Sequence, residues 1–220
     1  MKTKKTLLAI VLLAINYSIC IAQPGPGFGS NGFTKFISGD VKFLKGQTSL
    51  SLKFCYDNMM VGDLTEDAYI KQKTQEQNRM KSGSGDSWAI KWTNDRMARY
   101  EPEFLKWFNN SMKKLGIVST SVNGEASTTY TILVKTTKIE PGVYTGVSTF
   151  GHDIGEDTYV NIQADIIESA NPSNVLASIS VTKVIGTATS FANYDAGLRI
   201  TNAYMNAGKN LGSFIVKNCK

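Results

Sequence analysis

The only histidine of the chain, His152, lies in the acidic run His152-Asp153-Ile154-Gly155-Glu156-Asp157. A hydrolase triad needs a histidine that a carboxylate orients toward a nucleophile, but a neighbour in sequence such as Asp153 is rarely that partner. The sequence has no Gly-x-Ser-x-Gly motif to mark a nucleophile. The acidic run also lacks the spacing of an EF-hand loop. We therefore predict no catalytic residue and no metal site; the run indicates a polar turn between strands, with weak calcium binding as the alternative.

A glycine-rich segment, Gly83-Ser84-Gly85-Asp86-Ser87, has some features of a phosphate-binding loop. It lacks the Gly-Lys-Ser/Thr ending of such loops and does not follow a strand pattern. The segment is typical of a linker in which Asp86 or Ser87 caps the next helix. The sequence therefore predicts no bound cofactor.

Three tryptophans, Trp88, Trp92 and Trp107, lie in an aromatic-rich stretch of helical character. Trp88 and Trp92 are four residues apart, so they share one face of a helix. Such side chains most commonly pack in a core. The alternative is an exposed aromatic groove that binds a protein or a glycan.

The first 22 residues have the three parts of a secretory signal peptide. They begin with Lys2, Lys4 and Lys5, continue with an apolar run over residues 7–15, and end at Ala22. The apolar run is too short to span a bilayer, which takes about 20 residues. We expect cleavage after Ala22, export, and no transmembrane segment in the mature chain. The alternatives are an uncleaved anchor and a lipid on Cys20, which the bulky residue before it disfavours.

The signal peptide also accounts for half of the net charge. The whole chain carries +6, and removal of three lysines leaves +3. This small charge, without any block of like charges, does not predict nucleic-acid binding. The mature chain keeps two cysteines, Cys55 and Cys219. In an oxidising compartment, these two cysteines either form one disulfide or remain two free thiols.

The mature chain has the length of one domain. Residues 23–40 are rich in glycine and proline and are predicted to be a flexible leader, so the domain covers residues 41–220. Period-two alternation and helical spacing predict the order of the elements. We expect strands at 50–56, 117–122, 130–139, 159–168 and 175–182, and helices at 65–80, 87–99, 103–115 and 196–216.

Each clear strand has one apolar and one polar face. This pattern predicts an α/β two-layer sandwich: a mixed or antiparallel sheet of four or five strands with helices on one face. The polar face is a candidate surface for a partner, with an ordinary solvated surface as the alternative. It is formed by Asn161, Gln163, Asp165, Ser178, Ser180 and Thr182.

The strand at residues 130–137 (YTILVKTT), the turn at 170–177 (ANPSNVLA) and the long C-terminal helix together resemble small exported proteins of Bacteroidetes. More distantly, the order of elements is similar to the α/β domains of envelope lipoproteins. These are the outer-membrane activator of penicillin-binding proteins, the curli-secretion lipoprotein and the N-terminal domain of the Tol-system propeller protein. The resemblance implies protein binding rather than catalysis, and it transfers no functional residue.

The leading hypothesis is a non-enzymatic accessory or adaptor protein of the bacterial cell envelope that binds another envelope protein. The alternative is an exported module that binds a small molecule or glycan through Trp88, Trp92 and Trp107. We expect the protein to reside in the periplasm or to be secreted. Association with the outer membrane is compatible with either location. The sequence leaves the oligomeric state open.

Overall fold

The computed structural model describes residues 32–124, 126–149, 152–187 and 195–220, so the predicted signal peptide lies outside the described residues. The strands are β1 (Phe33–Gly39), β2 (Ser49–Cys55), β3 (Met60–Val61), β4 (Leu64–Thr65), β5 (Val118–Ser121), β6 (Tyr130–Glu140), β7 (Val143–Thr149), β8 (His152–Glu156), β9 (Tyr159–Glu168) and β10 (Asn171–Ile185). The α-helices are α1 (Glu66–Met80), α2 (Ser84–Asp95), α3 (Glu101–Met112) and α4 (Ala196–Asn218), with 3-10 turns η1 (Lys42–Leu44) and η3 (Lys113–Leu115) and a π-helical turn η2 (Arg96–Tyr100).

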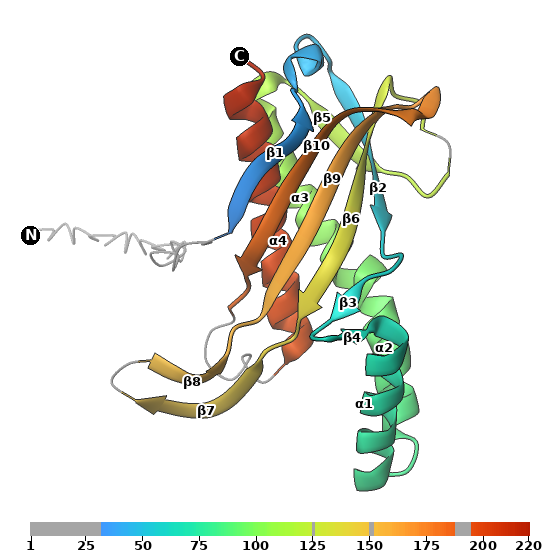
Figure 1. Ribbon diagram of the computed structural model, residues 1–220, viewed down its shortest axis with the longest axis vertical. Coiled ribbons are helices and arrows are strands. Elements are labelled where there is room, and N and C mark those ends of the chain that lie inside the picture. The colour runs from blue at the N-terminus through green and yellow to red at the C-terminus, as the bar shows by residue number, and fades with distance from the viewer. Residues whose placement is uncertain (1–31, 125, 150–151, 188–194) are drawn as a thin grey trace, which may run out of the picture.

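The main sheet has the order β1-β10-β9-β6-β2-β5, and β3 and β4 extend it beside the end of β6. Strands β1, β10, β9 and β6 pair antiparallel, whereas β2 is parallel to both β6 and β5. The predicted mixed sheet with helices on one side is thus confirmed (Figure 1). The prediction of four or five strands was too low, because the main sheet has eight.

Strand β1 accounts for part of this difference, since it lies within the segment that we predicted to be a flexible leader. It pairs with β10 over most of its length, and Phe36 packs on Phe214 of α4 with ring centroids 4.8 Å apart. Its other large apolar residues, Phe33 and Ile37, are 70% and 55% exposed. The missing apolar alternation and the surrounding glycines explain why the strand was not predicted.

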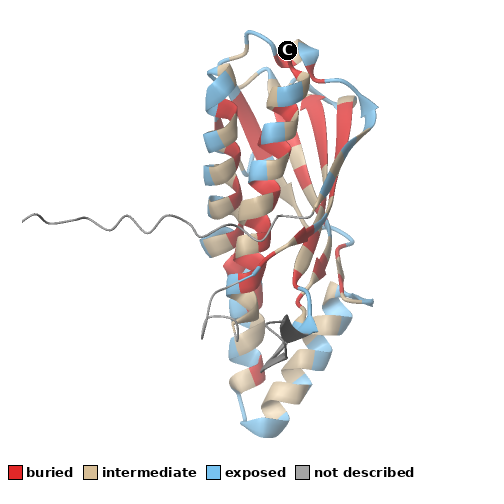
Figure 2. Cartoon of the chain, turned by 90° about the vertical axis from the view of Figure 1, so that its left-hand side faces the viewer, coloured by how far each residue is buried: buried red, intermediate tan, exposed pale blue. Residues whose placement is uncertain are grey.

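Helices α3 and α4 lie side by side on one face of the sheet, and the buried residues lie between the two layers (Figure 2). The two helices approach to backbone contact at Gly208 and Gly212 of α4. A Cβ atom at Gly212 would lie 2.9 Å from the carbonyl oxygen of Phe108, and one at Gly208 would overlap the carbonyl oxygen of Phe104. Two small residues four positions apart thus set the distance between the helices.

The predicted helices at 87–99 and 103–115 are one continuous helical stretch in the structure. Helix α2 passes through η2 directly into α3, with Pro102 at the start of α3. The π-helical turn accommodates the proline, which cannot donate a backbone hydrogen bond. Upstream, Gly83 with φ 79° is the N-cap of α2, which begins at Ser84, so the prediction that residues 83–87 form a linker in which Asp86 or Ser87 caps the helix was wrong. Helices α1 and α2 form a hairpin that projects beyond one end of the sheet (Figure 1).

Both edges of the sheet carry features that hinder pairing with another strand. On β5, the amides of Val118 and Val122 face β2, so the backbone of Ser119 faces outward. The Asn109 side chain satisfies that backbone: its Nδ2 donates to the Ser119 carbonyl and its Oδ1 accepts from the Ser119 amide, both at 2.8 Å. At the other edge, β1 has an irregular register between Phe36 and Ser38.

We predict that Gly208→Ala lowers the free energy of unfolding by about 1–3 kcal/mol, because the added methyl group forces α3 away from α4. Urea unfolding followed by tryptophan fluorescence measures the change. Gly124→Ala is the matched control, since a Cβ atom there meets nothing within 4 Å. Equal stability of the two variants would contradict the close helix approach.

We also predict that Asn109→Ala opens the β5 edge and makes the protein self-associate as its concentration rises. The reason is that the outward amide and carbonyl of Ser119 lose their partner. Sedimentation velocity over a concentration series measures the effect. The control is Asn110→Ala, whose exposed side chain accepts a hydrogen bond from Lys113 on the helix surface; identical sedimentation of both variants refutes the proposed role of Asn109.

Candidate functional site

Among the described residues, no helix lies on the face of the sheet opposite α3 and α4, and we call this face the free face (Figure 1). Strand pairing places its side chains in rows, because directly paired residues point to the same side of a sheet. One row runs across β2, β6, β9 and β10 as Lys53, Leu133, Asp165 and Ser178. The next row is Cys55, Lys135, Gln163 and Ser180. Four of the six residues of the predicted polar face, Gln163, Asp165, Ser178 and Ser180, thus lie in these two rows.

A buried carboxylate lies at the centre of this face. Asp165 is only 4% exposed, and its oxygens accept hydrogen bonds from Lys135 Nζ at 2.7 Å, Ser178 Oγ at 2.6 Å and Gln163 Nε2 at 2.9 Å. Burial by itself raises the pKa of Asp165, but the hydrogen bonds from Lys135, Ser178 and Gln163 outweigh it and hold the pKa below its usual value. Asp165 is therefore an ordered, charged centre rather than a solvated surface residue.

Asn161, another residue of the predicted polar face, has a structural role. Its Oδ1 accepts a hydrogen bond of 2.7 Å from the backbone amide of Lys183. Lys183 has a φ of 51° at an irregular point in the pairing of β10 with β9. Because a lysine in this left-handed conformation is strained, the Asn161 side chain stabilises the distortion.

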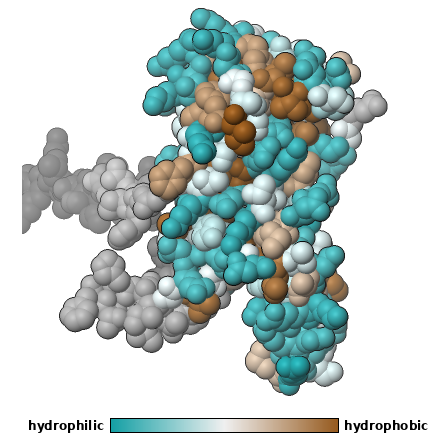
Figure 3. All heavy atoms as spheres, in the orientation of Figure 1, coloured by the Kyte–Doolittle hydropathy of each residue, from teal (hydrophilic) through white to brown (hydrophobic). Residues whose placement is uncertain are grey.

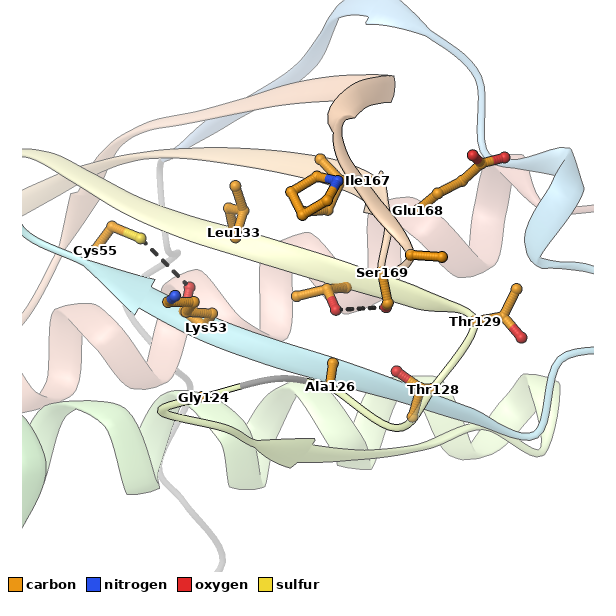
Figure 4. A pocket seen from close by; sticks show the side chains of 13 residues that line it. Lys53, Cys55, Gly124, Ala126, Thr128, Thr129, Leu133, Ile167, Glu168 and Ser169 are labelled. Atoms are coloured by element: carbon orange, nitrogen blue, oxygen red, sulfur yellow. Dashed lines mark hydrogen bonds between the residues drawn. The ribbon is translucent and has the colours of Figure 1, made fainter.

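A groove of about 1010 Å³ lies in the free face, between the β5–β6 connection and the β9–β10 turn (Figure 4). The β5–β6 connection folds back over the sheet, where Thr128 Oγ1 donates to Ser51 Oγ at 2.9 Å. On the floor, the hydroxyls of Thr131 and Ser169 lie 2.8 Å apart. The lining residues are Lys53, Cys55, Gly124, Ala126, Thr128, Thr129, Thr131, Leu133, Ile167, Glu168, Ser169, Ala170 and Pro172.

A second hollow of about 370 Å³ shares Cys55 with the first and continues along β2 and β6. It is lined by Cys55, Asp57, Asn58, Lys135, Thr136 and Thr137. We call the two hollows together the sheet groove. Hydrophobic side chains gather at the upper part of the free face, above a hydrophilic middle (Figure 3). The sheet groove therefore leads from an apolar region to a polar one.

The chemistry of the sheet groove suits binding. Its lining combines aliphatic side chains with threonine and serine hydroxyls and contains no aromatic residue. Burial raises the pKa of the Cys55 thiol, as does the nearby Asp57 carboxylate, and these outweigh the lowering effects of Lys53 and Lys135. The thiol is thus protonated near neutral pH and a poor nucleophile.

The other residues considered from the sequence do not form a site in the described structure. His152 and Asp153 begin strand β8, so the prediction of a turn there was wrong, and their side chains lie outside the described residues. The described part of the chain has no group of three metal-ligating side chains. It also has no helix long and apolar enough to cross a bilayer.

The three tryptophans do not share one surface. Trp88 and Trp92 stack at 5.6 Å within the α1–α2 hairpin, packed against Tyr69, and Trp92 Nε1 donates to Glu66 at 2.8 Å. Trp107 lies on α3, where its Nε1 donates to Glu103. At about 1.5 Å per residue, the continuous helix separates Trp92 from Trp107 by roughly 20 Å. The pair in α2 holds the helical hairpin together.

The two cysteines are free thiols in the structure. Cys55 points to the free face, in the row that contains Lys135, whereas Cys219 is buried in the core on the helix side. The sheet lies between the two sulfur atoms, which is why this fold does not bring them together. Sequence spacing alone could not decide between the disulfide and the free thiols.

We predict that Asp165→Asn lowers the free energy of unfolding at pH 7 by about 1–3 kcal/mol, because Lys135 loses a charged partner. Since folding lowers the pKa of Asp165, its stabilising effect is present above the ordinary aspartate pKa, near 3.9, and is lost as pH falls through the folded-state pKa. The stability difference should therefore shrink on acidification. Urea titrations from pH 7 to pH 3 test this against Asp57→Asn; a pH-independent difference contradicts it.

Comparison with known proteins adds only distant structural similarities. No family model matches the chain, and no curated protein matches its sequence. The PelC dodecamer from Paraburkholderia phytofirmans aligns at 12% identity and a TM-score of 0.35, over 80% of this chain and 97% of that one.

A DUF330 protein from Xanthomonas campestris aligns at 8% identity and a TM-score of 0.33, over 79% of this chain and 86% of that one. A putative neuraminyllactose-binding hemagglutinin homolog from Helicobacter pylori aligns at 8% identity and a TM-score of 0.34, over 80% and 89%. The resemblance to Bacteroidetes proteins and envelope lipoproteins that we inferred from the sequence is not confirmed by these three similarities and stays a prediction.

Proposed function

We propose that the mature chain is an exported, non-enzymatic binding protein of the bacterial cell envelope. Its sheet groove receives an extended segment of another envelope protein. Export rests on the predicted signal peptide, and the binding role rests on the free face. Protein binding in the cell envelope, the leading hypothesis from the sequence, is thereby assigned to the free face of the sheet.

The observation that carries the proposal is the sheet groove itself. It runs along β2 and β6, so its long direction follows an extended chain rather than a compact ligand. Aliphatic side chains such as Leu133 and Ile167 can take up apolar side chains of a peptide. The hydroxyls of Thr128, Thr129 and Ser169 lie beside them and are suitable partners for peptide amides and carbonyls.

The sheet edges are less suited to this role than the face. Addition of a strand needs a row of unpaired backbone groups, and Asn109 already occupies the outward backbone of β5 at Ser119. Strand β1 has an irregular register and carries Lys35, two features that discourage pairing at an edge. A partner is therefore expected to lie on the face of the sheet.

The glycan-binding alternative has less support. Sugar rings commonly pack on exposed aromatic rings, and the sheet groove has no aromatic residue in its lining. The aromatic pair Trp88 and Trp92 instead packs within the helical hairpin. Trp107 lies apart from this pair, on α3, where its Nε1 donates to Glu103.

Site-specific photo-crosslinking in the native envelope tests the proposed function. A benzoylphenylalanine in place of Leu133 or Thr129 should give one protein adduct on illumination, and mass spectrometry should map the crosslink to a single short segment of the partner. The same probe in place of Lys114, on the helix side, is the matched control. The absence of adducts from the two groove positions, or equal adducts from Lys114, would overturn the proposal.

A further inference from the structure

Two lysines flank one point of the sheet groove. In the parallel pairing of β2 with β6, Lys53 lies opposite Leu133 and Cys55 lies opposite Lys135. Lys53 and Lys135 are therefore diagonal neighbours on the same face, with a backbone separation on the order of 7–8 Å. Both ammonium groups act electrostatically on the Cys55 thiol, which lies where the two hollows meet.

The two ammonium groups have different surroundings. Lys135 is held at 2.7 Å from the buried Asp165 carboxylate, and its side chain remains 42% exposed. An ammonium has three N–H donors, so this fixed group keeps donors for a ligand. Lys53 is exposed and has no ion-pair partner among the described residues. The pair thus combines a fixed cation with an unpaired one.

Three acidic groups lie near this pair of lysines. Both oxygens of Asp165 are occupied by Lys135, Gln163 and Ser178, and the residue is buried. Glu168 lines the opposite side of the groove from Lys53 (Figure 4). Asp57 lies in the second hollow with Cys55 and Lys135, where its carboxylate acts electrostatically on the Cys55 thiol. The groups left to bind an anion are the ammonium of Lys53, which has no ion-pair partner among the described residues, and the remaining N–H donors of Lys135.

We infer that the peptide bound in the sheet groove carries a carboxylate that lies between Lys53 and Lys135. The residues on one side of this carboxylate are apolar, because Leu133 and Ile167 form the adjacent floor. Partial exclusion of water by these side chains strengthens the attraction between unlike charges. The carboxylate comes from an aspartate or glutamate side chain or from a chain terminus. This inference rests on the proposed function.

Four synthetic pools of seven-residue peptides test the inference on the mature protein. Variable positions are drawn from alanine, valine, leucine, serine, threonine and proline. The first pool has a central aspartate and an amidated end, the second a central asparagine and an amidated end. The third has only variable positions and a free carboxyl end, and the fourth has only variable positions and an amidated end. Fluorescence polarisation of labelled pools measures each apparent affinity.

We expect the aspartate pool, the free-carboxyl pool, or both to bind about five- to tenfold more tightly than their uncharged counterparts, and the advantage to fall as salt rises. The aspartate pool reports a side-chain carboxylate, and the free-carboxyl pool reports a chain terminus. Lys53→Gln should remove most of the advantage that the carboxylate pools have over the uncharged pools. Lys114→Gln makes the same charge change on the helix side and should leave the advantage intact.

Two negative results have different meanings. If no pool binds, the proposed function fails. If uncharged pools bind and the carboxylate gives no advantage, or if Lys53→Gln and Lys114→Gln behave alike, peptide binding stands and the carboxylate inference is overturned. Urea unfolding of both variants checks that neither change alters the fold.

Discussion

The backbone contact between α3 and α4 is the constraint on which the rest of the structure depends. Gly208 and Gly212 let the two helices lie close together, so that one narrow helical layer covers one face of the sheet. The core then forms between this layer and the alternate residues of β6, β9 and β10. The same alternation directs the remaining side chains to a face without helices, and every binding property discussed above belongs to that face.

A face without a helical layer still needs its polar groups satisfied. The hydrogen bonds around Asp165 do this at the centre, and the β5–β6 connection covers Ser51 near one end. What remains open between these two features is the sheet groove. Its aliphatic and hydroxyl lining, together with Lys53 and Lys135, gives it the chemistry for an extended ligand with an anionic group.

The sequence predicted those features that depend on local periodicity. Alternation in residues 159–168 and 175–182 predicted the one-sided sheet and its polar face, and helical spacing predicted α4. Strand β1 was missed because two of its large apolar residues are exposed. The groove was missed because its walls are a connection and a turn that meet only in the folded chain. Helical spacing likewise could not show that Trp88 and Trp92 pack within a hairpin.

The most direct measurement is chemical-shift mapping by NMR of the isotope-labelled mature protein during titration with a pool of unlabelled seven-residue peptides. If the sheet groove binds an extended chain, the amide shifts should concentrate on Lys53, Cys55 and Leu133 and on the neighbouring parts of β9. The amides of the α1–α2 hairpin should stay unchanged. Shifts centred on Trp88 and Trp92, or no shifts at all, would contradict the account.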